Sequence, residues 1–152
     1  TRRDAMKTKK TKLLSLLLLT GSLLTATGHA AGEDWLGGLN NFSTDQGKVL
    51  LQFSRDLYQH KQLPDAEYIR CLLPVDAAAG DEKTKEEWTE SFKMIQDAAQ
   101  GMGYGSYLEF VDLEERARIG KQLADGRWLR KFKNEFRSCL YTPEVKGTLK
   151  MH

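Results

Sequence analysis

Nowhere in the 152-residue sequence do β-branched residues alternate with polar residues over a run that ends in an Asn-Gly or Asp-Gly turn. Such alternation is the pattern of a half-buried strand, and such turns join the strands of hairpins. The sequence also contains no internal repeat and no low-complexity segment. Instead, apolar residues recur at spacings of three and four, which indicates amphipathic helices. We therefore expect an all-α domain, a small bundle of four to five amphipathic helices.

Side chains that carry metal or nucleophilic chemistry are scarce. Apart from one histidine in the first thirty residues, the histidines are His60 and His152. Neither has a Cys, His or carboxylate at metal-ligand spacing, so no metal site and no cofactor are expected. His60 would have to serve any Ser-His-Asp triad, and an exposed helical histidine is the simpler interpretation. The chain is accordingly not expected to be an enzyme.

No apolar run reaches the roughly 20 residues that cross a bilayer as a helix. The apolar stretch 13–24 follows Met6 and four lysines, and it precedes the small-residue sequence Ala-Thr-Gly-His-Ala-Ala. This order is typical of a secretory signal peptide, here residues 6–30, with cleavage after Ala30. Residues 1–5 would then be an upstream extension or an artificial addition. A short buried helix and an uncleaved membrane anchor are the alternatives for this segment.

Removal of residues 1–30 would change the charge of the protein. These residues hold six of the 23 basic side chains and one of the 21 acidic ones, so residues 31–152 carry 17 basic and 20 acidic side chains, a formal net charge of −3. A net acidic, exported protein is a poor partner for nucleic acid. We expect residues 31–152 to form a single helical domain, periplasmic or secreted, with a flexible entry segment at 31–42 and no stable membrane insertion after signal cleavage.

Both cysteines, Cys71 and Cys139, lie in the part of the chain that would be exported. In an oxidising compartment, an even pair in a small domain most simply forms one disulfide. Closing a loop of this length would stabilise the fold by about 4 kcal/mol in the chain-entropy model. Two buried thiols and an intermolecular bridge remain alternatives.

Helix boundaries are indicated by capping boxes, in which a serine or threonine precedes a glutamate or glutamine by three residues. The pattern occurs at 43–46, 84–87 and 106–109. The first box predicts a helix from Thr44 to about His60. A short second helix is expected to begin at Pro64 and to stop before Pro74, because the residue before a proline disfavours helical backbone. The segment from Asp76 to Thr84 is expected to be a loop.

The second half of the chain shows three further helical patterns. The helix after the box at Thr84 is expected to end just before Gly101, which suits the first position after a helix, and Asp112 is expected to begin another helix that continues through Leu123. The apolar residues of the helix after Thr84, Trp88, Phe92, Ile95 and Ala99, give the clearest amphipathic pattern of the chain. The last pattern, 126–140, is also strongly amphipathic and ends before Thr142-Pro143. Its apolar face consists of Trp128, Leu129, Phe132, Phe136, Cys139 and Leu140. We expect this helix to be the structural clamp of the domain, the helix that holds the others together.

Charge is distributed unevenly between two consecutive segments. Residues 76–115 contain eleven acidic and three basic side chains, whereas residues 116–137 contain eight basic and two acidic ones. The two segments could neutralise each other across the helix packing. Alternatively, they could form a dipolar surface that steers a charged partner.

The loop Gly101-Met-Gly-Tyr-Gly105 is the candidate binding site. A phosphate-cradling loop would follow a strand and contain a lysine, and this loop follows a helix and contains none. Tyrosine is enriched in binding surfaces, so Met102, Tyr104 and Tyr107 are the expected partner-binding residues. The alternative is that both tyrosines fold back onto the core.

These features predict a small exported protein that binds another protein, with an inhibitor or immunity-type protein that occludes a partner's cleft as the specific version. A homo-oligomer is left open. One alternative is an envelope or acid-stress chaperone-like protein, whose many carboxylates lose their charge at low pH. A carboxylate-dependent hydrolase is the third alternative, because several glutamates are available for acid–base chemistry, namely Glu86, Glu87, Glu90, Glu109, Glu114 and Glu115.

Overall fold

The computed structural model describes residues 34–151. The predicted signal peptide at residues 6–30 and the residues before it lie outside this range. The chain divides into two compact units, residues 1–37 and 38–152. Within the first unit, the described residues belong to the short 3-10 helix η1 (Asp34–Gly38), which reaches the boundary.

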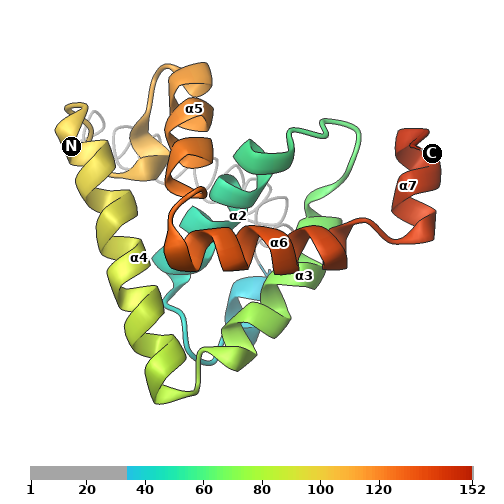
Figure 1. The fold of residues 1–152 in the computed structure, drawn as a ribbon, viewed down its shortest axis with the longest axis horizontal. Coiled ribbons are helices and arrows are strands. Elements are labelled where there is room, and N and C mark those ends of the chain that lie inside the picture. Colours follow the sequence, from blue (N-terminus) through green and yellow to red (C-terminus); the bar gives the residue numbers. More distant parts are fainter. Residues whose placement is uncertain (1–33, 152) are drawn as a thin grey trace, which may run out of the picture. The chain divides into compact units, whose positions relative to one another are not determined.

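The described part of the second unit consists of helices and loops, without a strand (Figure 1). It contains six α-helices and a second 3-10 helix: α2 (Thr44–Tyr58), α3 (Asp65–Ala78), α4 (Glu82–Gly101), η2 (Tyr107–Glu109), α5 (Leu113–Leu123), α6 (Arg127–Leu140) and α7 (Pro143–Leu149). The all-α prediction is therefore confirmed. The number of α-helices exceeds the four to five expected, because the chain forms a further helix after Thr142.

α2 makes its most extensive contacts with α5 and α3, and it also packs against η2 and α6. It begins with the predicted capping box. The Ser43 hydroxyl accepts the N–H of Gln46 at 3.1 Å, and the Gln46 side chain accepts the N–H of Ser43 at 2.9 Å. This reciprocal pair satisfies two N–H groups at the helix start and sets the register of the buried Leu50 and Phe53.

α3 continues through Pro74, so the prediction that this helix stops before the proline is wrong. Pro74 removes one helical hydrogen bond, the one to the carbonyl of Arg70. The continued helix places the Asp76 carboxylate against the chain before α2. There it accepts three consecutive N–H groups, those of residues 40–42, at 2.8–2.9 Å. Asp76 is only 1% exposed, and this cluster of hydrogen bonds compensates for its burial.

α4 begins earlier than predicted. The capping box expected at Thr84 is absent, because Asp81 is the N-cap and its carboxylate accepts the N–H of Thr84 at 3.1 Å. The loop predicted from Asp76 to Thr84 is consequently confined to residues 79–81. The predicted apolar face is buried at Trp88, Ile95 and Ala99.

The connection between α4 and α5 also differs from the expectation in two details. Gly101 is the last residue of α4, and Gly103, with a φ of 88°, takes the left-handed backbone that lets the chain leave the helix. Ser106 forms no side-chain cap, so the third predicted capping box is wrong. The predicted cap at Asp112 is correct, since its carboxylate accepts the N–H of Glu115 at 3.0 Å.

α6 contacts α3 and α4. Of the predicted apolar face, Leu129, Phe132, Phe136 and Leu140 are buried, whereas Trp128 and Cys139 are half-buried. The predicted disulfide between Cys71 and Cys139 is present and joins α3 to α6, with 5.8 Å between the Cα atoms. The Phe132 ring lies 5.2 Å from the Trp88 ring of α4, measured between centroids. α6 is therefore joined to α3 covalently and packs against α4 through aromatic rings.

α7 is the helix that the sequence pattern did not predict. Pro143 occupies its first turn, where the missing proline N–H costs nothing. The Thr142 hydroxyl caps it by accepting the N–H of Val145 at 3.1 Å, and Val145 is buried. Among residues 34–151, no helix combines the length and the apolar character that a membrane crossing requires.

Candidate functional site

Tyr107 anchors the segment between α4 and α5 in the core. Its side chain is 1% exposed, and its hydroxyl donates a hydrogen bond to Oδ2 of Asp56 at 2.6 Å. Arg116 of α5 donates to both oxygens of the same carboxylate, at 2.8 and 3.2 Å. Burial, and then the bond to Asp56, raise the pKa of the Tyr107 phenol, which therefore stays protonated and keeps donating.

Tyr104 provides a second anchor, closer to the surface. Its half-buried ring packs edge-on against Phe110, with 4.3 Å between centroids, and both lie against Ala99 of α4. The backbone N–H of Tyr104 also donates to the carbonyl of Ala99 at 3.0 Å. Two tyrosines thus fasten a glycine-rich segment to the helices on either side of it.

Aliphatic side chains of this segment point away from the core instead. We call residues 102–113 the tip; it connects the C-terminal end of α4 to the start of α5 (Figure 1). Its exposed apolar side chains are Met102 (43%), Leu108 (39%), Val111 (85%) and Leu113 (58%). The tip also carries Glu109 and Asp112, and it has no basic residue. Exposed apolar residues and acidic residues thus occur together along the tip.

The three predicted site residues therefore occupy different environments. Met102 is exposed, Tyr104 is half-buried, and Tyr107 lies in the core, as the alternative for the tyrosines foresaw. Sequence reasoning did not single out Val111 or Leu113 as displayed residues. Val111 precedes Asp112, the N-cap of α5, and so lies outside that helix. The helical periodicity of α5 therefore gives no reason to expect Val111 on its buried face.

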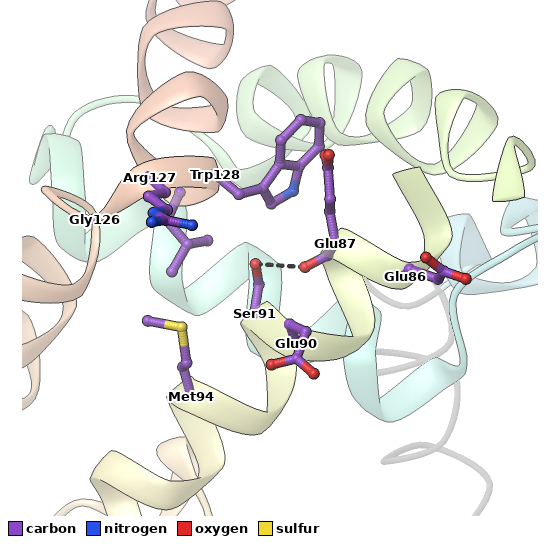
Figure 2. A pocket seen from close by; sticks show the side chains of 9 residues that line it. Glu86, Glu87, Glu90, Ser91, Met94, Gly126, Arg127 and Trp128 are labelled. Atoms are coloured by element: carbon purple, nitrogen blue, oxygen red, sulfur yellow. Dashed lines mark hydrogen bonds between the residues drawn. The ribbon is translucent and has the colours of Figure 1, made fainter. Parts of the chain in front are cut away.

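A pocket of about 510 Å³ lies between the N-terminal half of α4 and the first turn of α6 (Figure 2). Three of the glutamates considered for acid–base chemistry, Glu86, Glu87 and Glu90, line it from α4. Its apolar walls come from Met94, Trp128 and Leu129, and Ser91, Gly126 and Arg127 complete the lining. The hydroxyl of Ser91 is engaged within α4, where it donates to the backbone carbonyl of Glu87.

A groove between α2 and α5 adjoins the tip, because Leu113 and Glu114 line it. Most of its charged groups already have partners, and two of them, Arg55 and Arg118, pair with Asp65 and Glu115 outside the groove. Arg116 pairs with Asp56 on α2, and Lys121 donates to the Gln59 side chain at 3.2 Å. This groove therefore offers few unsatisfied groups for chemistry.

His60 differs from the exposed helical histidine that was expected. It follows the end of α2, is half-buried, and its Nε2 lies 2.7 Å from the hydroxyl of Tyr141. Burial lowers the pKa of His60 below its ordinary value. Within residues 34–151, no group of three or more His, Cys, Asp or Glu side chains is arranged to hold a metal ion.

The charged segments do not neutralise each other across the helix packing through ion pairs. Among the described residues, the one salt bridge between the two segments is Glu115–Arg118, within α5. The other salt bridges of the basic segment join Arg116 to Asp56 of α2, Lys131 to Glu135, and Lys133 to Asp125. The acidic surface of α4 and the basic surface of α6 thus keep separate charges, which favours the dipolar alternative.

No protein-family model, no curated protein and no solved structure matches this chain.

Proposed function

We propose that this protein binds another protein and occludes its cleft with the tip, in the manner of an inhibitor or immunity protein. The observation that carries the proposal is the exposure of aliphatic side chains on an anchored segment, above all Val111 at 85%. Contiguous exposed apolar surface on a soluble domain commonly marks an interaction site. The buried Tyr107 hydroxyl fixes the segment beforehand, so binding costs less ordering entropy.

The charges around the tip indicate the chemistry of the partner. Glu109, Asp112 and Glu114 lie among the exposed apolar residues along the chain, without a basic residue between Gly101 and Glu115. A complementary cleft would have an apolar floor and a basic rim. We expect association to be fastest at low ionic strength, because the exposed charges are screened by salt.

Site-specific photocrosslinking tests the proposal. A photoreactive amino acid replaces Val111 in one protein and the exposed Ser138 of α6 in a control, and both are mixed with envelope extract of the source cells. We expect a discrete crosslinked species from position 111 alone, competed by unlabelled protein. The purified partner should then lose its activity when the protein is added in equal amount.

The double substitution Val111→Ser with Leu113→Ser tests the contribution of the tip to that complex. Apolar anchors at the centre of an interface typically contribute 2 kcal/mol or more, so we expect the affinity to fall at least about 30-fold. Crosslinking that is equal at positions 111 and 138, or an unchanged affinity of the double variant, would contradict the proposed function.

An envelope or acid-stress chaperone-like protein is the second candidate, and one observation favours it. The buried carboxylates Asp56 and Asp76 accept hydrogen bonds that hold the tip and the start of α2. Loss of these hydrogen bonds in acid would release both segments and expose apolar surface. Circular dichroism and sedimentation between neutral pH and about pH 2 separate the candidates, because an intact monomer at low pH contradicts the chaperone-like role.

A further inference from the structure

We infer that the pocket between α4 and α6 is a second binding site, which takes an arginine or lysine side chain from a peptide segment of a partner. The pocket is distinct from the tip. Its glutamates lie in the N-terminal half of α4, whereas the tip follows the C-terminal end of that helix. At 1.5 Å per residue, the two surfaces are about 20 Å apart along α4.

The walls of the pocket suit the aliphatic part of a basic side chain. Met94 is 44% exposed although it is a large apolar residue, and it faces the pocket together with the indole of Trp128. Arginine and lysine carry three or four methylene groups, which pack against apolar surface while the charged end remains at a polar rim. The volume of about 510 Å³ is ample for one such side chain and part of its backbone.

The rim supplies the opposite charge. Glu86, Glu87 and Glu90 line the pocket, and none of them forms a salt bridge with another residue of the described chain. Arg127 is the one basic residue in the lining. In the view of Figure 2, Glu87 extends towards the indole of Trp128, whereas Arg127 lies on the other side of the pocket with Met94. The Glu87 side of the pocket therefore favours a cation.

Trp128 gives a reason to expect a peptide as the source of the cation. Its indole N–H is buried and has no hydrogen-bond acceptor among the described residues. A buried donor without an acceptor is costly, and a backbone carbonyl of a docked peptide that reaches the half-buried ring would satisfy it. The ring already tolerates a cation nearby, because the Lys131 ammonium lies 4.7 Å from its centroid.

Three capped tripeptides of matched length test the inference: acetyl-Arg-Leu-Arg-amide, acetyl-Gln-Leu-Gln-amide and acetyl-Glu-Leu-Glu-amide. Each is titrated into the ¹⁵N-labelled protein, and the indole N–H resonance of Trp128 is followed after assignment with Trp128→Phe. We expect the arginine peptide to shift this resonance in a saturable way. The glutamine peptide should bind at least several-fold more weakly, and the glutamate peptide should not bind.

Charge-neutralised variants locate the binding. Glu87→Gln with Glu90→Gln removes two rim charges, and we expect about fivefold weaker binding of the arginine peptide, as for two exposed ion pairs. The control, Glu82→Gln with Glu114→Gln, makes the same charge change outside the pocket and should bind as the unmodified protein does. All four glutamates are on helix surfaces, and circular dichroism checks that both proteins are folded.

Three outcomes would overturn the inference: equal binding of the three peptides, an unmoved Trp128 resonance, or equal loss of affinity in the rim variant and its control. These outcomes are separate from a failure of the proposed function. The titration needs neither the cellular partner nor the tip, whereas crosslinking at Val111 reports on the tip alone.

Discussion

The hydroxyl of Tyr107 and Oδ2 of Asp56 are 2.6 Å apart in the core, and this contact depends on an absent side chain at Gly120. A Cβ at Gly120 would lie 2.5 Å from the Tyr107 hydroxyl oxygen, well inside van der Waals contact. The glycine in the middle of α5 thus makes room for the residue that anchors the tip. A glycine that weakens helix α5 is therefore needed for the core contact that fixes the candidate site.

Gly120→Ala should destabilise the protein, although alanine favours a helix by about 1 kcal/mol over glycine. The added methyl group would displace the Tyr107 hydroxyl, and overpacking of this kind costs about 1–3 kcal/mol. In a Tyr107→Phe background the clash is relieved, so the same change should cost less there. Urea denaturation of the four proteins measures the coupling. A Gly120→Ala protein more stable than the unmodified protein would contradict this account.

Asp76→Asn should destabilise the fold by about 2–3 kcal/mol, because the amide nitrogen cannot accept the N–H groups that the carboxylate now binds. Those N–H groups belong to residues 40–42, directly before α2. Thermal unfolding measures the loss, and hydrogen exchange should increase first at residues 40–42. Asp81→Asn is the matched control, since Asp81 is an exposed cap and asparagine caps helices about as well as aspartate. Equal losses in both variants would argue against a special role of Asp76.

Phe132→Ala and Trp128→Ala should differ in cost, although both residues belong to the predicted apolar face of α6. Phe132 is 2% exposed and packs against the rings of Phe53, Trp88 and Phe136. Its removal should cost about 3–5 kcal/mol. Trp128 is half-exposed at the wall of a pocket, so its removal should cost less. Chemical denaturation measures the free energy of unfolding of both variants. A larger loss of stability in Trp128→Ala than in Phe132→Ala would contradict the central position of Phe132 in the core.

Stability should fall as the pH rises above about 10, the ordinary pKa of tyrosine. Burial raises the pKa of Tyr58 to about 12, and burial together with Asp56 raises that of Tyr107. Between pH 10 and 12 the unfolded chain loses these phenolic protons while the folded chain keeps them, so each further increase in pH favours unfolding. This stabilisation is fully present below pH 10.

Tyrosinate absorbance and circular dichroism, recorded together during an alkaline titration, test this prediction. We expect phenolate to appear mainly as helical signal is lost. Tyr58→Phe should weaken the pH dependence in this range. Ionisation of all five tyrosines near pH 10 with the helical signal intact would contradict the burial of these phenols.

The sequence alone was sufficient for features that depend on neighbours along the chain. The apolar faces of α2, α4 and α6 follow from spacings of three and four, and the caps at Ser43 and Asp112 form as their patterns indicate. Where two residues can cap the same helix, the local sequence pattern did not predict which one does. Asp81 displaced Thr84 as the cap of α4, because α3 extends through Pro74 and shortens the loop between the two helices.

Which residues of the α4–α5 connection are exposed depends on contacts between helices that are distant in the sequence. Tyr107 turns inward for two reasons. Asp56 of α2 accepts its hydroxyl hydrogen bond, and the missing side chain at Gly120 of α5 leaves space for the hydroxyl. Both residues belong to helices other than the segment that contains Tyr107. Val111 and Leu113 are left outside as a result. The α4–α6 pocket likewise requires the approach of two distant helices. Helical periodicity is a local property of the chain, whereas exposure depends on what packs against a side chain, and that is settled only when the helices assemble.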